Sequence, residues 1–551
     1  MLPAVNLLAF LCSLTLGLLM KAHAAPSHKP AGLVDLGYAK LVPTFDTKTT
    51  SGKKISVYKN IRFAKAPTGD LRFRLPDTRL PRVDTIQDGN MPDEQNSHCI
   101  SSAPAGAPFP PYNGSTWGRE DCLFLDVWVP EGVRSGDKLP VLHWIVGGGY
   151  AFGSKDMFVS PLGLFDMMDR STEFIFVASN YRLGLAGWTY LPGEDLTANL
   201  GMHDCLAATT WTSKFIARFG GDPERITAMG GSAGAGIIGL LTVLNGGEGK
   251  LPFQQVQAQT PKSDWSHSNI KTTTQALLSS PDIPPRRNPI ERQKHLFQTI
   301  LEEANCTSLE CLRGAPEAAM LYLNDKLING ASSDAGGGVF GPAPGFGPVV
   351  DGTFIPDIPV KLFQQGKYHK DLRSLVVGNA ANEGMGLSHD EGFPDYFPIM
   401  VRQILSTVSN DTIAYIQSHY AFADEPAKLA WDWTTDVIFA CNAANIATAY
   451  KDRTRRYIFS VPPALHGQDM FYLFYLNQTM TPVEDVNAAR VLQRCLLRFL
   501  HGHEFPWPVY GREKRITNFT TSGFEDVPLP ADLRARCEMV NRVVLDPRNG
   551  V

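Results

Sequence analysis

The sequence predicts an α/β protein with a mostly parallel β-sheet that is covered by helices on both faces. Short apolar runs with the length of buried strands lie at residues 141–146, 174–179, 226–229 and 375–377. Such runs are typical of strands that are covered on both sides. Between them, residues 202–219 have the apolar spacing of a helix and end at a pair of glycines. Strands that alternate with helices along a chain favour a parallel sheet.

Two later regions, residues 281–323 and 394–434, have a more helical pattern, and we expect them to cap the sheet. The segment AGGGVFGPAPGFGP at residues 335–348 is predicted to be a loop, because Gly and Pro disfavour both helix and strand. The length of 551 residues permits one large α/β unit or two to three ordinary domains.

The composition is that of a globular protein, with 43% apolar and 19% charged residues. A formal net charge of −4 over the whole chain gives no reason to expect nucleic acid or an anionic membrane as a partner. The oligomeric state is not predictable from these properties.

The N-terminus has the features of a secretory signal peptide. Residues 5–20 are almost continuously apolar, and the A-H-A pattern at residues 22–24 is typical of a cleavage site. We therefore expect residues 1–24 to be removed and the protein to reach the extracellular space or another secretory compartment, such as a vacuole or the cell wall. An uncleaved anchor is the alternative, but the run is short for a bilayer span. We expect no stable membrane anchor elsewhere.

Cysteines and glycosylation signals fit the secretory route. Eight cysteines remain after cleavage, and none forms C-x-x-C, which argues against zinc ribbons and thioredoxin-like redox chemistry. Five N-x-S/T sequons are candidate glycosylation sites: Asn113, Asn305, Asn410, Asn477 and Asn518.

The stretch AMGGSAGAGIIG at residues 228–239 matches two incompatible motifs. Counted from Gly230 it contains G-x-S-x-G, which is typical of a nucleophilic serine on a tight turn between a strand and a helix. Counted from Gly234 it contains G-x-G-x-x-G, the phosphate-binding fingerprint of dinucleotide-binding folds. The fingerprint requires a strand that ends directly before its first glycine and an acidic residue about 20 positions later.

The serine motif fits this chain better. We predict that the strand ends at Met229, so that Gly230 is the turn glycine and Gly234 comes four residues too late. No acidic residue lies between positions 255 and 263. Ser232 is therefore the candidate nucleophile.

Collinear segments along most of the chain resemble the type-B carboxylesterase family, which includes lipases and cholinesterases of the α/β-hydrolase fold. The resemblance extends from about residue 61 to residue 510. It rests on IRFAKAPTGDLRF, EDCLFLDVWVP, LPVLHWIVGGGYAFGS, NLGMHDCLAATTWTSKFIARFGGDP, FGPVVDGTFIP, VVGNAANEG and FPWPVY, which follow the family's order. It implies an α/β-hydrolase fold with helical cap insertions, formed as one large domain over residues 25–551, and the chain resembles secreted fungal members in particular.

The resemblance also implies a catalytic triad. A serine hydroxyl needs a base, and the base needs a carboxylate that orients it; in this fold the chain order is Ser, acid, His. With Ser232 as the nucleophile, Glu383 in N-E-G is the expected acid and His466 in PALHGQD the expected base. The competing acid is Asp351, which we interpret as a turn residue. The competing base is His501 in LHGHE, whose flanks resemble a segment beyond the catalytic loop.

Backbone N–H groups must stabilise the oxyanion of the tetrahedral intermediate. The resemblance assigns this role to Gly148, Gly149 and Ala233. The chain departs from the family at two positions: Val146 stands where a His usually precedes the three glycines, and Gly231 where a Glu usually precedes the nucleophile. Neither position belongs to the expected triad. We therefore expect the departures to change the hydrogen bonding around the three-glycine loop and around the turn that carries Ser232.

The resemblance further implies two disulfides and two structural ion pairs. The disulfides would join Cys99 to Cys122 and Cys306 to Cys311, while Cys205 is interpreted as a buried thiol. The pairing of Cys441, Cys495 and Cys537 is not predictable from the sequence. The ion pairs would be Arg72 with Glu120 and Arg182 with Asp204.

These observations predict a secreted serine carboxylesterase that acts on a small-molecule ester. An acyltransferase or lactone-forming enzyme with the same acyl-enzyme is an alternative, and a non-catalytic, cholinesterase-like binding module is another. We expect no cofactor. We also expect no metal, because His501 and His503 offer two ligands without a complete shell.

Overall fold

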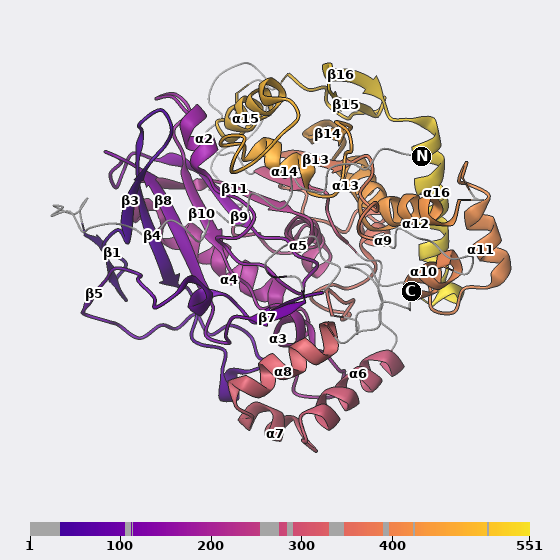
Figure 1. Ribbon diagram of the computed structural model, residues 1–551, viewed down its shortest axis with the longest axis horizontal. Helices are drawn as coiled ribbons and strands as arrows, with labels where there is room; N and C mark the ends of the chain where they lie inside the picture. Colours follow the sequence, from indigo (N-terminus) through magenta and orange to yellow (C-terminus); the bar gives the residue numbers. More distant parts are fainter. Residues whose placement is uncertain are drawn as a thin grey trace.

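The core of the fold is one mixed β-sheet. The computed structural model describes residues 33–104, 112, 114–253, 275–283, 290–329, 346–388, 396–422, 425–503 and 506–550. Within them, eleven strands form the sheet in the order β16-β15-β14-β13-β12-β11-β9-β10-β8-β4-β3 (Figure 1). The bounds are β3 Phe45–Lys48, β4 Lys54–Arg62, β8 Phe124–Pro130, β9 Leu139–Ile145, β10 Ile175–Ser179, β11 Gly221–Gly231, β12 Gln275–Ser279, β13 Ser374–Ala380, β14 Thr454–Phe459, β15 Arg515–Thr520 and β16 Gly523–Pro528.

The middle of the sheet is parallel and its two ends are antiparallel. Each neighbouring pair from β10 through β9, β11, β12, β13 and β14 to β15 is parallel. The pairs β10–β8, β8–β4, β4–β3 and β15–β16 are antiparallel. The predicted mostly parallel sheet is thus confirmed. Because parallel strands share one direction, their carboxyl ends meet at a single edge, which is where such folds place their sites.

Helices cover the sheet on both faces, as predicted. On one face, Trp144, Phe176 and Met229 form a hydrophobic cluster with residues of α2 Leu162–Met167, α14 Gln468–Leu473 and α15 Val486–Leu500. On the other face, alternate strand residues such as Ile145 and Ala228 belong to a larger cluster. That cluster includes α4 Leu200–Phe215, α5 Ala233–Leu241, α13 Cys441–Tyr450 and α16 Ala531–Leu545.

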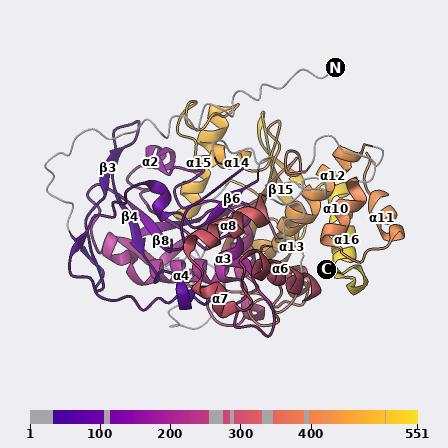
Figure 2. The same cartoon turned by 60° about the horizontal axis from the view of Figure 1, so that its bottom comes forward.

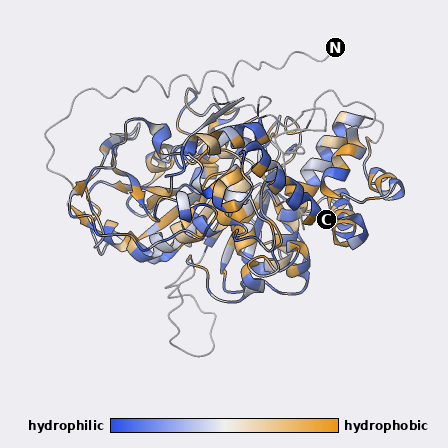
Figure 3. Cartoon of the chain, turned by 90° about the horizontal axis from the view of Figure 1, so that it is seen from below, coloured by the Kyte–Doolittle hydropathy of each residue, from blue (hydrophilic) through white to orange (hydrophobic). Residues whose placement is uncertain are grey.

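The predicted cap forms two helical groups at separate places on the molecule (Figures 1 and 2). The first contains α6 Ile290–Glu303, α7 Leu309–Gly314 and α8 Glu317–Ile328. The second contains α10 Tyr396–Ile404, α11 Asn410–Gln417 and α12 Pro426–Thr434, and it packs against α16. These outer helices carry both hydrophobic and hydrophilic residues (Figure 3), as expected of helices with one buried face.

The predicted strands and helix lie close to their observed bounds, with two differences. The helix expected at 202–219 ends as an α-helix at Phe215 and continues as a 3₁₀ turn, Ile216–Phe219. The strand expected to end at Met229 continues through Gly231, because Gly230 and Gly231 pair with Leu278 and Ser279 of β12. The turn therefore begins at Ser232 itself. Most of the predicted loop at 335–348 lies outside the described residues.

Three disulfides are present among the described residues: Cys99–Cys122, Cys306–Cys311 and Cys441–Cys537. Cys205 and Cys495 are buried thiols.

Three of the candidate glycosylation sites are exposed: Asn305, Asn410 and Asn477. Asn518 is half-buried in β15, and its Oδ1 accepts a hydrogen bond from Ser460. The signal peptide expected at 1–24 and the sequon at Asn113 lie outside the described residues.

Candidate active site

Ser232 occupies a sharp turn between β11 and α5. Its backbone has φ 55° and ψ −129°, a conformation that a non-glycine residue adopts only where the surrounding structure imposes it. The helix starts so close to β9 that a Cβ at Gly234 would lie 2.1 Å from the carbonyl oxygen of Ile145. The G-x-S-x-G motif thus folds as a strand–serine–helix elbow, which presents the hydroxyl at the carboxyl edge of the sheet.

The structure brings Ser232, His466 and Glu383 into one hydrogen-bonded chain. The Oγ of Ser232 lies 2.8 Å from Nε2 of His466, and Nδ1 of His466 lies 2.5 Å from Oε2 of Glu383. A carboxylate can only accept hydrogen bonds, so Nδ1 carries the proton and Nε2 is free to accept from the serine hydroxyl. Glu383 follows β13 and His466 follows β14, so that all three residues lie at the carboxyl edge of the sheet.

The Glu383 carboxylate is completely buried and is held at both oxygens. Its Oε1 accepts hydrogen bonds from the hydroxyl of Ser280 and from the backbone N–H of Ala380, both at 2.5 Å. Ser280 was not identified from the sequence. It directly follows β12, the strand next to β13, and this position at the carboxyl edge is the only signal that would have found it.

The surroundings of His466 favour its protonated form. Burial alone lowers the pKa of the imidazole, but the charge of Glu383 and its hydrogen bond outweigh that effect, with further contributions from Asp282 and Asp469. The net result is a pKa above the ordinary value of 6.5. The phenyl ring of Phe439, which the sequence did not indicate either, packs on the imidazole with 4.6 Å between ring centroids.

The loop after β9 lies directly against the elbow. A Cβ at Gly147 would lie 2.7 Å from the carbonyl oxygen of Gly231 and 2.9 Å from Cβ of Ser232, so only glycine permits this approach. Gly148 and Gly149 follow with φ values of 113° and 57°. Ala233 is the first residue of α5 and is fully buried. The residues expected to form the oxyanion hole thus belong to the two segments that meet at Ser232.

The two departures from the family pattern are buried in apolar surroundings. A Cβ at Gly231 would lie 3.3 Å from Sδ of Met470 and 3.3 Å from the indole of Trp144, so the space beside Ser232 is already filled. Val146 is also buried, and its carbonyl oxygen accepts a hydrogen bond from Tyr181.

Asp351 and His501, the alternatives for the acid and the base, have interactions that differ from those of Glu383 and His466. The carboxylate of Asp351 accepts hydrogen bonds from Asn199 and from the backbone of Thr353 and Ile355, as befits a turn residue. The pKa of His501 is lowered to about 4, first by burial and then by the nearby charge of Arg225. Arg225 lies towards the start of β11, whereas Ser232 follows the end of that strand.

Both of the expected structural ion pairs are present, and both are buried. The guanidinium of Arg72 donates to both oxygens of Glu120 at 2.6 Å. Arg182 donates to both oxygens of Asp204 at 2.8 and 2.7 Å.

No group of three or more His, Cys, Asp or Glu side chains in the described part of the chain could hold a metal ion. None of the helices described there is long and apolar enough to cross a membrane.

This chain is similar to one protein family and to proteins that belong to named classes of enzyme. The model of the carboxylesterase family matches residues 42–512. The chain is 32% identical to "Carboxylesterase patB" of Aspergillus clavatus, over 97% of this chain and 99% of that protein. It is 31% identical to "Secreted triacylglycerol lipase LIP1" of Gibberella zeae, over 62% of this chain and 57% of that protein.

The fold is similar to a solved structure. The crystal structure of Aspergillus niger EstA superposes with a TM-score of 0.77 at 21% identity, covering 95% of this chain and 100% of that one. The α/β-hydrolase fold expected from the sequence is thus confirmed.

Proposed function

Because this chain belongs to the carboxylesterase family and is a carboxylic ester hydrolase, we propose that it cleaves small-molecule esters through an acyl-enzyme on Ser232. The observation that carries the proposal is the continuous hydrogen-bonded chain from the Ser232 hydroxyl through His466 to the buried carboxylate of Glu383. Such a chain makes a serine nucleophilic, because the base can take the hydroxyl proton while the carboxylate stabilises the resulting imidazolium.

In the first half of the reaction, Oγ of Ser232 forms a bond to the ester carbonyl carbon while its proton moves to Nε2 of His466. The carbonyl oxygen becomes an oxyanion, which the backbone N–H groups of Gly148, Gly149 and Ala233 stabilise. The intermediate then expels the alcohol, whose oxygen takes the proton back from Nε2. The product of this half is an ester between the acyl group and Ser232.

In the second half, His466 removes a proton from a water molecule as that water attacks the acyl carbon. Collapse of the second intermediate breaks the bond to Oγ, which regains the proton from Nε2 and releases the carboxylic acid. If an alcohol replaces the water, the same step yields a new ester. Product analysis with and without added alcohols therefore separates hydrolysis from acyl transfer.

The proposal includes secretion. It is supported by the apolar N-terminal run with its A-H-A pattern, by the three disulfides and by similarity to a relative named as secreted. We propose cleavage after residue 24 and glycosylation at the sequons. Among the sequons on described residues, the half-buried Asn518 is the least accessible.

A fluorophosphonate probe tests the nucleophile, because an activated serine displaces its fluoride and becomes covalently labelled. We expect the wild-type protein to be labelled and the Ser232→Ala variant to remain unlabelled. A panel of p-nitrophenyl esters of increasing acyl length, assayed with both proteins, then defines the substrate class. Label or turnover that persists in Ser232→Ala would overturn the assignment, and an unlabelled wild-type protein would favour a binding module.

A further inference from the structure

The π-helical turn Thr435–Ala440 carries a phenyl ring onto the candidate base. The ring of Phe439 is fully buried and lies 4.6 Å from the His466 imidazole, with an angle of 38° between the planes. We propose that Phe439 is a positioning residue that holds the His466 imidazole in line with Ser232 and stabilises its cationic form. This inference rests on the proposed function, since it assigns Phe439 a role only through His466.

Residues 435–440 have an unusual backbone conformation, and this conformation directs the ring of Phe439 towards His466. Residues 435–440 form a π-helical turn between α12 and α13, and π-turns inserted in helices are frequent at functional sites. A π-turn contains an extra residue and rotates the side chains that follow it. The ring of Phe439 reaches His466 from this turn, 27 positions earlier in the chain.

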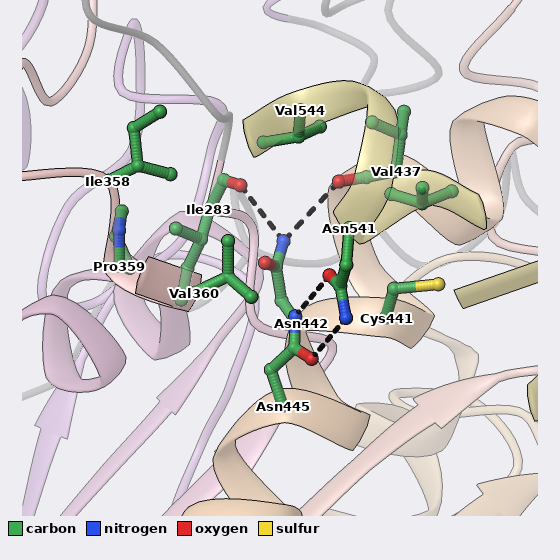
Figure 4. Close-up of a pocket in the computed structure, with 11 residues that line it drawn as sticks. Ile283, Ile358, Pro359, Val360, Val437, Cys441, Asn442, Asn445, Asn541 and Val544 are labelled. Atoms are coloured by element: carbon green, nitrogen blue, oxygen red, sulfur yellow. Dashed lines mark hydrogen bonds between the residues drawn. The ribbon is translucent and has the colours of Figure 1, made fainter. Parts of the chain in front are cut away.

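The turn is fixed to the core of the protein. Nδ2 of Asn442 donates hydrogen bonds to the carbonyl oxygens of Ile283 and Ile438 at 2.9 and 2.6 Å. Figure 4 shows this amide between Ile283 and Val437 of the turn, in a small pocket that is lined by both apolar and asparagine side chains. Ile283 lies only a few residues after Ser280, which itself donates to Glu383.

The turn is also fixed to the last helix, α16. Asp436 in the turn accepts a hydrogen bond from Nε of Arg536 at 2.7 Å, and Cys441 forms a disulfide with Cys537. One turn further along α13 and α16, the amides of Asn445 and Asn541 form a reciprocal pair at 2.9 Å (Figure 4). A ring carried on a turn that is held from two sides cannot move away from His466 easily.

The same turn contacts the residue that follows Glu383, the expected acid of the triad. Oγ1 of Thr435 accepts a hydrogen bond from the backbone N–H of Gly384 at 2.9 Å, and Gly384 directly follows Glu383. One short segment therefore contacts the residue next to the acid through Thr435 and the base through Phe439. This arrangement fixes the position of the imidazole relative to the carboxylate.

The electrostatics favour an aromatic ring at this position. The charged groups that act on His466 include the carboxyls of Glu383, Asp282 and Asp469. The face of a phenyl ring attracts a cation, and an imidazolium forms on His466 in each half of the proposed reaction. An aliphatic side chain of similar size would fill the space without this attraction and would leave the imidazole freer to rotate.

The test compares Phe439→Leu with a matched control, Phe397→Leu. Phe397 is also buried in the cap, and its ring packs on Trp433, with 6.2 Å between ring centroids, instead of on His466. We expect Phe439→Leu to lower kcat about tenfold, with little change in KM, and to lower the apparent pKa of kcat/KM. Phe439→Tyr, which keeps the aromatic face, should retain most of the activity. Phe397→Leu should lower only thermal stability.

The outcomes separate this inference from the proposed function. Fluorophosphonate labelling of Ser232 is followed as a rate for every variant. Equal labelling rates for wild type and Phe439→Leu, a change in KM alone, or equal losses of kcat in Phe439→Leu and Phe397→Leu would overturn the inference and leave the triad intact. Absence of label on the wild-type protein would overturn the proposed function and the role of Phe439 with it.

Discussion

Ser280 donates its hydroxyl hydrogen to Oε1 of Glu383, while Oε2 of the same carboxylate faces Nδ1 of His466. Removing this donor leaves the buried carboxylate with one fewer hydrogen bond and more freedom to turn. A hydrogen bond to a charged group contributes about 1.5–3 kcal/mol, so we expect Ser280→Ala to lower kcat at least about tenfold while KM changes little.

A matched control for Ser280 is Ser388→Ala. Ser388 is also buried, and its hydroxyl hydrogen-bonds to Thr434 instead of a triad member. Steady-state kinetics with one p-nitrophenyl ester should show the loss in Ser280→Ala alone. An equal loss in both variants would mean that Ser280 supports only the packing.

Replacing the acid by its neutral amide tests the electrostatic role of Glu383. The Glu383→Gln side chain keeps the shape but removes the charge that stabilises the imidazolium, and its amide can impose the wrong tautomer on His466. By analogy with other serine triads, we expect kcat to fall by about 10³–10⁴-fold. Retention of more than a tenth of the activity would exclude Glu383 as the acid, and Asp351→Asn serves as the control at the competing carboxylate.

The pH profile follows from the direction of the His466 shift. Burial lowers the pKa of the imidazole, but the charge and the hydrogen bond of Glu383 raise this pKa by more than burial lowers it. The net pKa therefore lies above 6.5. The proposed base must be neutral to accept the serine proton, so kcat/KM should rise with pH through an apparent pKa above 6.5. In Glu383→Gln the contributions of the Glu383 charge and hydrogen bond disappear, so the pKa of His466 should fall and the residual activity should persist to lower pH. A profile that is flat between pH 5 and 8 would contradict this assignment.

Some parts of the site can be predicted from the sequence because neighbouring residues determine them, whereas other parts depend on contacts between distant segments. The strands and the Ser232 elbow are encoded by neighbouring residues, since a buried apolar run followed by G-x-S-x-G sets both the strand and the turn. The continuation of β11 through Gly231 depends on pairing with β12, which is a tertiary property. Ser280 and Phe439 have no local pattern, because their roles arise only when distant segments meet.

The surroundings of Gly231 limit which side chain can precede Ser232, the proposed nucleophile. The Glu expected from the family would have to enter space occupied by Met470 and Trp144, each 3.3 Å from a hypothetical Cβ. We therefore predict that Gly231→Glu lowers kcat/KM more than tenfold, by displacing Met470 and by placing a charge in an apolar region. The double variant Gly231→Glu with Met470→Ala should recover part of the activity. If the two substitutions act additively, the contact with Met470 is not the cause.

The buried pair of Arg72 and Glu120 should determine stability rather than catalysis. Both side chains are almost completely buried, at 4% and 3% exposure, and Arg72 also donates to the carbonyl oxygens of Leu312 and Ala315. Replacing Arg72 by Met leaves the Glu120 carboxylate buried without its counter-charge, which typically costs about 3–5 kcal/mol. The thermal midpoint of Arg72→Met should fall by several degrees, while kcat at low temperature stays close to that of the wild type. The control is Arg79→Met, since Arg79 is 87% exposed in its pair with Asp77 and such exposed pairs contribute little. Equal midpoints for the two variants would show that the Arg72 pair is not a stabilising element.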